Sequence, residues 1–115
     1  VGQVGVVKES QIDAVASVSG ASPAYVYLFI EALADGAVML GLSREEAYRF
    51  ASQAVVGAAK MVQQTGEHPA KLKDAVCSPG GTTIEAIAKL EEKGFRSAII
   101  EAMRANDQKA KKMKQ

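Results

Sequence analysis

Apolar residues recur at helical spacing along most of the chain, and a strand-like pattern is confined to its first residues. Residues 3–7 alternate weakly and are rich in β-branched side chains, which predicts a short strand. No other segment of the sequence is predicted to pair with that strand. It would therefore need a partner strand from another chain or from a missing domain. The pattern as a whole predicts an all-α helical bundle of about six helices with a short N-terminal strand remnant.

Two helices are expected before residue 40. Ser10 is a candidate N-cap for the first, which carries apolar residues at helical spacing (Ile12, Val15, Ala16 and Val18). The segment "SGASP" contains Gly20 and Pro23 and is expected to break this helix, with Pro23 in the first turn of the next. That second helix, over residues 23–40, is apolar on nearly every face, which predicts contacts on all sides.

The third helix has a recognisable start in "LSREEAYRF". Ser43 and Glu46 have the spacing of a capping box, in which each side chain bonds to the other residue's backbone N–H. Gly57 would allow another helix to come close. The helix carries a stripe of small and apolar residues, namely Ala47, Phe50, Ala51, Ala54, Val55, Ala58 and Met61.

Glycine and proline separate the remaining elements. Gly66 should end the third helix and Pro69 should begin a fourth in "PAKLKDAVC". A fifth helix follows the Gly-Gly turn and runs to about Lys93, where Gly94 stops it. A sixth begins near Phe95 and is expected to fray into a basic tail.

Composition and charge limit the possible partners. The chain has 115 residues, of which 48% are hydrophobic and 23% charged, with a net charge of +1. These values indicate one domain and give no support for a nucleic-acid or membrane partner. The apolar run over residues 24–42 is interrupted by Glu31 and Asp35, which favours a buried helix over a membrane span. The basic tail could be a nucleic-acid arm, but a solvated helix end is the favoured interpretation.

Few residues could carry acid–base, nucleophilic or metal chemistry. Cys77 is the only cysteine and His68 the only histidine, so neither an internal disulfide nor a conventional zinc cluster can form. A lone cysteine fits a reducing compartment, and we expect a cytoplasmic protein. Cys77 and His68 could form a nucleophile with its base, but a small buried thiol and an exposed histidine are favoured. Glu31 and Asp35 could likewise pair for acid–base work, although a polar helix face is the preferred interpretation.

The turn "SPGGTT" over residues 78–83 is the strongest candidate for ligand binding. Thr82 and Glu85 have the spacing of a second capping box, so a helix should begin at the threonines with its free N–H groups facing Gly80 and Gly81. Glycines without side chains would let a small carboxylate or phosphate lie against those groups. The alternative is that the glycines only form a tight turn and Thr82 only caps a helix.

The segment "HPAKLKDAVCSPGGTTIEAIAKLE" resembles the signature of pyrroline-5-carboxylate reductases, and similarity to that family extends over residues 13–103. Ala21 departs from the family, which more often has serine there. The resemblance implies that residues 11–115 are a helical dimerisation and substrate-loop domain. Residues 1–10 would then be the trailing edge of a nucleotide-binding domain that this sequence lacks.

The family reduces 1-pyrroline-5-carboxylate to L-proline with NADPH or NADH, the last step of proline biosynthesis. By resemblance, Ser78, Gly80, Gly81 and Thr82 would hold the substrate carboxylate, and Thr83 would be the catalytic contact to the ring nitrogen. The family forms an intertwined homodimer, and an assembly of several dimers is left open. A purely structural homodimerisation module without ligand binding is the alternative function.

No cofactor or metal site is expected on this chain. The sequence has neither a G-x-G-x-x-G segment after a strand nor a G-x-x-x-x-G-K-[ST] segment, which are the two familiar ways of holding nucleotide phosphates. NADPH or NADH would therefore bind only in the complete enzyme. We expect the isolated chain to be inactive.

Overall fold

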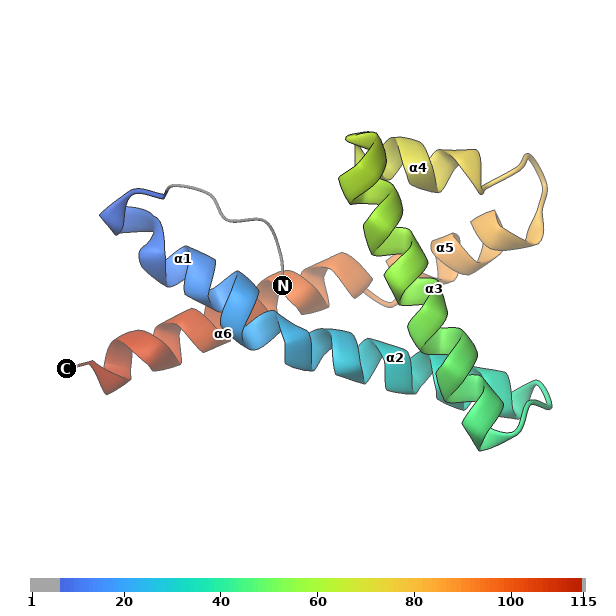
Figure 1. Ribbon diagram of the computed structural model, residues 1–115, viewed down its shortest axis with the longest axis horizontal. Coiled ribbons are helices and arrows are strands. Elements are labelled where there is room, and N and C mark those ends of the chain that lie inside the picture. The colour runs from blue at the N-terminus through green and yellow to red at the C-terminus, as the bar shows by residue number, and fades with distance from the viewer. Residues whose placement is uncertain (1–6, 115) are drawn as a thin grey trace. The chain divides into compact units, whose positions relative to one another are not determined.

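The computed structural model describes residues 7–114, and this part of the chain is built from helices without a strand, as the sequence predicts (Figure 1). The strand expected over residues 3–7 lies outside the described residues except for Val7, which belongs to no element. In chain order the elements are the 3-10 helix η1 (Glu9–Gln11), α1 (Ile12–Ala16), the π-helix η2 (Ser17–Ala21), α2 (Ser22–Met39), α3 (Arg44–Thr65), α4 (Pro69–Ala75), α5 (Thr82–Glu92) and α6 (Phe95–Met113).

The chain divides into two compact units. The central unit comprises residues Tyr27–Phe95, and the terminal unit combines the described residues before Tyr27 with those after Phe95. The boundary falls within α2 and just after the start of α6.

The expected break at "SGASP" does not occur, because α1 continues through the π-helix η2 directly into α2. Pro23 has no N–H, so one carbonyl of the preceding turn loses its backbone donor. In this segment the Ser22 hydroxyl donates to the Val18 carbonyl, which a donor at position 23 would reach in a π-turn. One turn earlier, the Ser19 hydroxyl donates to the Val15 carbonyl at 2.8 Å. Ser10 is also not an N-cap, since it lies inside η1, where Lys8 occupies that position.

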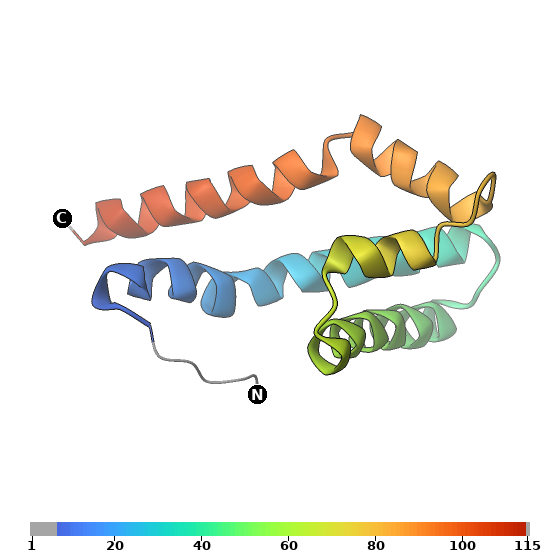
Figure 2. The same cartoon turned by 90° about the horizontal axis from the view of Figure 1, so that it is seen from above.

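Within the terminal unit, α1 and η2 run beside the C-terminal half of α6 in the opposite direction (Figure 2). Asn106 donates to the Ser17 hydroxyl at 3.3 Å, and Ser17 is buried. Lys114 donates to Asp13 at 2.6 Å, and Lys111 pairs with Asp107 at 2.9 Å. The basic tail is therefore helical and held by ion pairs, and the expectation that it frays is wrong.

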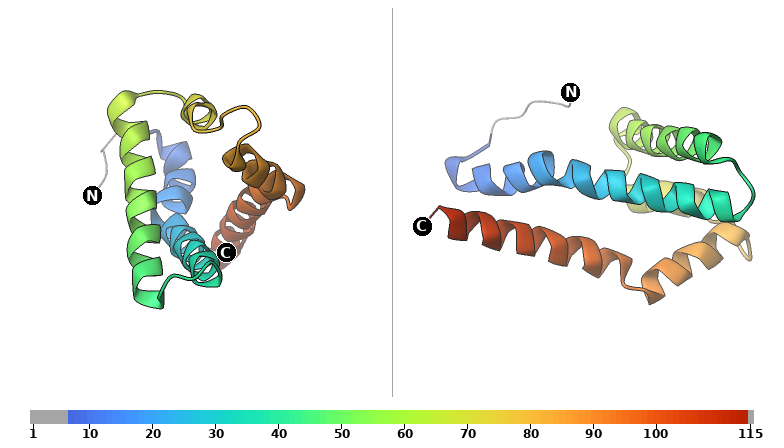
Figure 3. Two further views of the ribbon diagram at one scale, coloured as in Figure 1. Left: turned by 90° about the vertical axis from the view of Figure 1, so that its right-hand side faces the viewer. Right: turned by 90° about the horizontal axis from the view of Figure 1, so that it is seen from below.

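In the central unit, α2 and α3 meet near the loop that joins them (Figure 3). Their contact is made by three buried alanines, Ala34 from α2 with Ala47 and Ala51 from α3, flanked by partly buried residues of α2 (Ile30, Ala37 and Val38). Alanine has no side chain beyond Cβ, so the two backbones can approach closely. Only part of the predicted α3 stripe is buried in this way.

Polar and aromatic contacts reinforce the central unit. Arg44 pairs with Asp35, and the rings of Phe29 and Phe95 meet edge to face with centroids 6.1 Å apart. Glu31 and Asp35 both lie on an exposed face, which agrees with the polar-face interpretation rather than an acid–base pair.

The ends of α3 follow the sequence signals. The Ser43 hydroxyl accepts from the Glu46 N–H at 3.2 Å and donates to the Glu46 carboxylate at 3.0 Å. The N-cap is thus confirmed, although Glu46 bonds the Ser43 hydroxyl instead of its backbone N–H. Gly66 has a φ of 67°, and its N–H donates to the Val62 carbonyl at 3.2 Å, which closes the helix as predicted.

Large apolar side chains remain exposed on the described part of the chain, and none is fully buried. On α2, Tyr27 is 69% and Leu28 66% exposed, and on α3 Phe50 is 52% exposed. No neighbouring element lies within 4 Å of the position that a Cβ at Gly57 would take. None of the helices described is long and apolar enough to cross a membrane.

Replacing Ser43 by alanine should lower the free energy of unfolding by about 1 kcal/mol, because the Glu46 N–H loses its acceptor. Ser43→Asn keeps an N-cap acceptor and is the matched control. Urea denaturation of the three proteins measures the difference. Equal stability of the alanine and asparagine variants would contradict this account of the helix start.

The hydrogen bond and positive charge of Lys114 lower the pKa of Asp13 below its ordinary value. A lowered pKa means that the pair stabilises the folded state at neutral pH and loses this effect as the pH falls through the pKa of the folded state. Lys114→Ala should raise the Asp13 pKa towards its ordinary value, whereas Lys112→Ala should leave it nearly unchanged. NMR titration of the Asp13 carboxyl carbon tests this, and an unchanged pKa in Lys114→Ala would rule the pairing out.

Candidate functional site

The segment between α4 and α5 forms a tight turn at the residues that the sequence singles out. The Gly81 N–H donates to the Ser78 carbonyl at 3.0 Å, and Pro79 and Gly80 occupy the middle of the turn. Gly80 has a φ of 68°, a left-handed conformation that residues with a side chain rarely adopt. Proline followed by a left-handed glycine is the usual composition of a type II turn.

The start of α5 differs from the prediction by one residue. Gly81 is the N-cap, with extended backbone angles of −83° and 177°, and Thr82 is the first residue of the helix. Thr82 therefore does not cap α5 through its side chain, and the predicted capping box with Glu85 does not form. The local pattern identified the helix start correctly but placed the cap one position too late.

The start of α5 has backbone N–H donors that no side chain caps. No side chain caps α5, and the amides of Thr82, Thr83 and Ile84 have no acceptor one turn earlier in the helix. Together with the positive end of the helix dipole, these amides favour an anion. The Ser78, Thr82 and Thr83 side chains lie around the same helix start and are exposed, so a small carboxylate could reach them.

His68 and Cys77 do not form a nucleophile and base. The His68 Nδ1 accepts from the Ala70 N–H at 3.0 Å, which makes this exposed histidine the N-cap of α4. Cys77 is half-buried, and its N–H donates to the Asp74 carbonyl at 3.1 Å. Over residues 7–114 no three His, Cys, Asp or Glu side chains are grouped closely enough to hold a metal ion.

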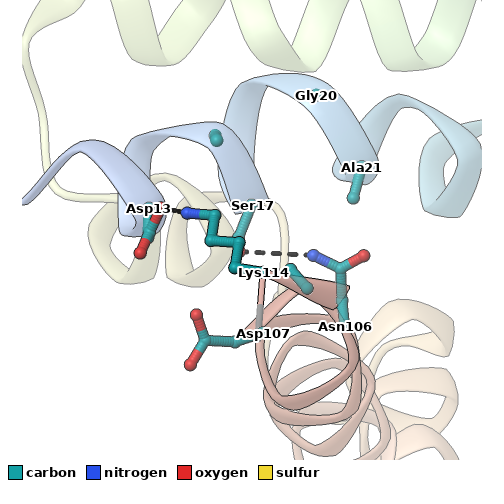
Figure 4. Close-up of a pocket in the computed structure, with 9 residues that line it drawn as sticks. Asp13, Ser17, Gly20, Ala21, Asn106, Asp107 and Lys114 are labelled. Atoms are coloured by element: carbon teal, nitrogen blue, oxygen red, sulfur yellow. Dashed lines mark hydrogen bonds and ion pairs between the residues drawn. The ribbon is translucent and has the colours of Figure 1, made fainter. Parts of the chain in front are cut away.

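The terminal unit contains an open hollow of about 350 Å³ that the sequence did not indicate (Figure 4). Asp13, Ser17, Asn106 and Lys114 line it, and they bond to one another as described above. In the described part of the chain, no buried side-chain nitrogen or oxygen lacks a partner. The hollow therefore contains no buried polar atom without a partner, and the α4–α5 turn remains the candidate site.

Comparison with protein families gives a match over residues 9–113 to the family described as pyrroline-5-carboxylate reductase dimerisation. Among curated proteins, the pyrroline-5-carboxylate reductase of Escherichia coli (strain K12) is 61% identical over 112 residues, which is 97% of this chain and 42% of that protein. The Arabidopsis thaliana pyrroline-5-carboxylate reductase is 49% identical over 115 residues, or all of this chain and 42% of that protein. The chain thus spans less than half the length of these relatives.

Solved structures of pyrroline-5-carboxylate reductases are also similar to this chain. A Plasmodium falciparum pyrroline carboxylate reductase with NADP bound superposes with a TM-score of 0.90 at 38% identity, covering 97% of this chain and 43% of that one. The 1-pyrroline-5-carboxylate reductase of Streptococcus pyogenes gives a TM-score of 0.91 at 36% identity, covering 96% of this chain and 43% of that one.

Proposed function

The chain belongs to the pyrroline-5-carboxylate reductase dimerisation family, and on this basis we propose that it is the dimerisation and substrate-binding domain of such a reductase. The complete enzyme would reduce 1-pyrroline-5-carboxylate to L-proline with NADPH or NADH. The observation that carries the substrate role is the uncapped start of α5 behind the Gly80–Gly81 turn. It offers free amides and a positive dipole end at the segment that resembles the family's substrate loop.

In this proposal the residues of the turn bind and orient the substrate. The amides of Thr82 and Thr83 and the Ser78 hydroxyl receive its carboxylate, and Gly80 and Gly81 leave room for it beside the backbone. The Thr83 hydroxyl contacts the ring nitrogen. Fixing both the carboxylate and the nitrogen holds the C=N bond in one orientation, which favours reaction at one ring face.

The nicotinamide cofactor would supply the hydride in the complete enzyme. Residues 7–114 include no strand followed by a glycine-rich phosphate loop. We infer the use of NADPH or NADH from the relatives, one of which has NADP bound. Positioning of the substrate is the contribution that we assign to this chain.

We further propose that the chain acts as a homodimer, which the exposed apolar surface of α2 and α3 supports. Side chains such as Leu28 and Phe50 are too large and too numerous on these helices to be left in water without cost. An assembly of several dimers is a larger form that the family resemblance allows. We place the enzyme in the cytoplasm, because free Cys77 suits a reducing compartment.

Thr83→Ala in the complete reductase should lower kcat/KM about tenfold or more, since the ring nitrogen loses its hydroxyl contact. Thr83→Ser keeps the hydroxyl and should retain most of the activity. The melting temperature should change little, because the Thr83 side chain does not cap α5. Steady-state kinetics with 1-pyrroline-5-carboxylate measures the effect, and equal kcat/KM in the wild type and both variants would refute the substrate role of Thr83.

The dimer is tested by sedimentation equilibrium of the chain at micromolar concentration, where we expect no stable folded monomer. Leu28→Lys places a charge on the exposed apolar face and should shift the protein towards unfolded or monomeric forms. Gln64→Lys adds the same charge at an exposed polar position of α3 and should leave the assembly intact. A compact, well-folded monomer of the unmodified chain would contradict the proposal, and larger species would report an assembly of several dimers.

A further inference from the structure

We propose that Gly81 is a positioning residue for the Ser78 hydroxyl, and that the absence of a side chain at position 81 keeps this hydroxyl at the start of α5. The inference deepens the proposed function and rests on it, because the Ser78 hydroxyl matters only if the turn binds the substrate carboxylate. It gives Gly81 a role distinct from that of its neighbour Gly80.

The supporting observation is a near contact between these two residues of the turn. A Cβ atom placed on Gly81 would lie 2.5 Å from the Ser78 Oγ and 3.2 Å from the Ser78 carbonyl oxygen. Carbon and oxygen atoms do not approach to 2.5 Å without bonding, so the hydroxyl occupies the space that a side chain at position 81 would need. At every other glycine in the described part of the chain, no neighbouring atom lies within 4 Å of the corresponding position.

Backbone conformation does not explain the glycine at position 81. Gly81 has a φ of −83° and a ψ of 177°, which any amino acid adopts. Gly80, in contrast, has a φ of 68°, and the space around its missing side chain is open. Gly80 is therefore needed to turn the backbone, whereas Gly81 is needed to leave space for the Ser78 hydroxyl.

Other constraints fix the backbone of Ser78 but not its hydroxyl. Its carbonyl accepts from the Gly81 N–H at 3.0 Å, and the following Pro79 restricts its backbone to extended conformations. Within residues 7–114 the Ser78 hydroxyl has no hydrogen-bond partner. The space at Gly81 thus permits a side-chain rotamer that places a free hydroxyl against the N-cap of α5, next to the amides that we assign to the carboxylate.

An alanine at position 81 would force Ser78 into another rotamer and turn its hydroxyl away from the helix start. In the complete reductase, Ser78→Ala and Gly81→Ala should each raise the KM for 1-pyrroline-5-carboxylate by about tenfold, which is typical of losing one hydrogen bond to a charged group. The kcat should stay within about twofold, because the lost contact is to the carboxylate and not to the reacting bond. The double variant Ser78→Ala/Gly81→Ala should have the same KM as Ser78→Ala, because no hydroxyl remains to be displaced.

Gly80→Ala is the matched control. It strains the backbone without approaching Ser78, so its effect should multiply with that of Ser78→Ala instead of disappearing. If Gly81→Ala fails to fold, Ser78→Ala/Gly81→Ala should fold better, because the 2.5 Å contact with the hydroxyl is removed and only the milder 3.2 Å contact with the carbonyl oxygen remains. No gain in folding would overturn the positioning role.

The results separate this inference from the function on which it rests. Multiplying effects of Ser78→Ala and Gly81→Ala, or an unchanged KM in Gly81→Ala, would overturn the positioning role while leaving the carboxylate site in place. An unchanged KM in Ser78→Ala would overturn both the positioning role and the assignment of Ser78 to the substrate. Failure of the unmodified complete protein to reduce 1-pyrroline-5-carboxylate would overturn the proposed function itself.

Discussion

The contact between α2 and α3 depends on alanine side chains, and this choice shapes the rest of the central unit. Ala34, Ala47 and Ala51 let the two helices approach near their shared loop, but alanine buries little apolar surface. The larger apolar residues of both helices consequently face outward, as Leu28 and Phe50 do. A fold with so small an internal core gains much of its hydrophobic stabilisation only when another surface covers these residues, which links folding to association.

Some signals that act within one turn of the chain predict the structure correctly, and those at the two ends of α3 are the clearest. Ser43 caps α3 and Gly66 ends it, because each does so through atoms of its immediate neighbours. The all-α fold class follows from the helical spacing of apolar residues, and the tight turn over residues 78–81 follows from Pro79 and Gly80. The Asn106–Ser17 contact joins residues 89 positions apart, and no local pattern encodes it.

Two local signals were ambiguous, and the structure resolved them against the prediction. Gly20 and Pro23 usually end a helix, yet here the hydroxyls of Ser19 and Ser22 satisfy carbonyls of the preceding turn and the helix continues. At α5 the spacing of Thr82 and Glu85 fits a capping box, but the extended backbone of Gly81 places the cap one residue earlier. Residue spacing alone could not decide whether the helix breaks at Pro23 or which residue caps α5, because both depend on backbone angles.

The π-helix η2 bears on how this segment of the chain tolerates a change in length. A π-turn contains one residue more than the α-helical turn it replaces, so it marks a place where a residue can be inserted or deleted without breaking the helix. Deleting one residue within Ser17–Ala21 would restore a regular α-helical turn and leave the helix on either side in nearly the same rotation, because the π-turn spreads one turn over one extra residue. Asp13 would then still face Lys114. The π-turn thus holds an extra residue without changing the rotational register between the first and last helices of the terminal unit.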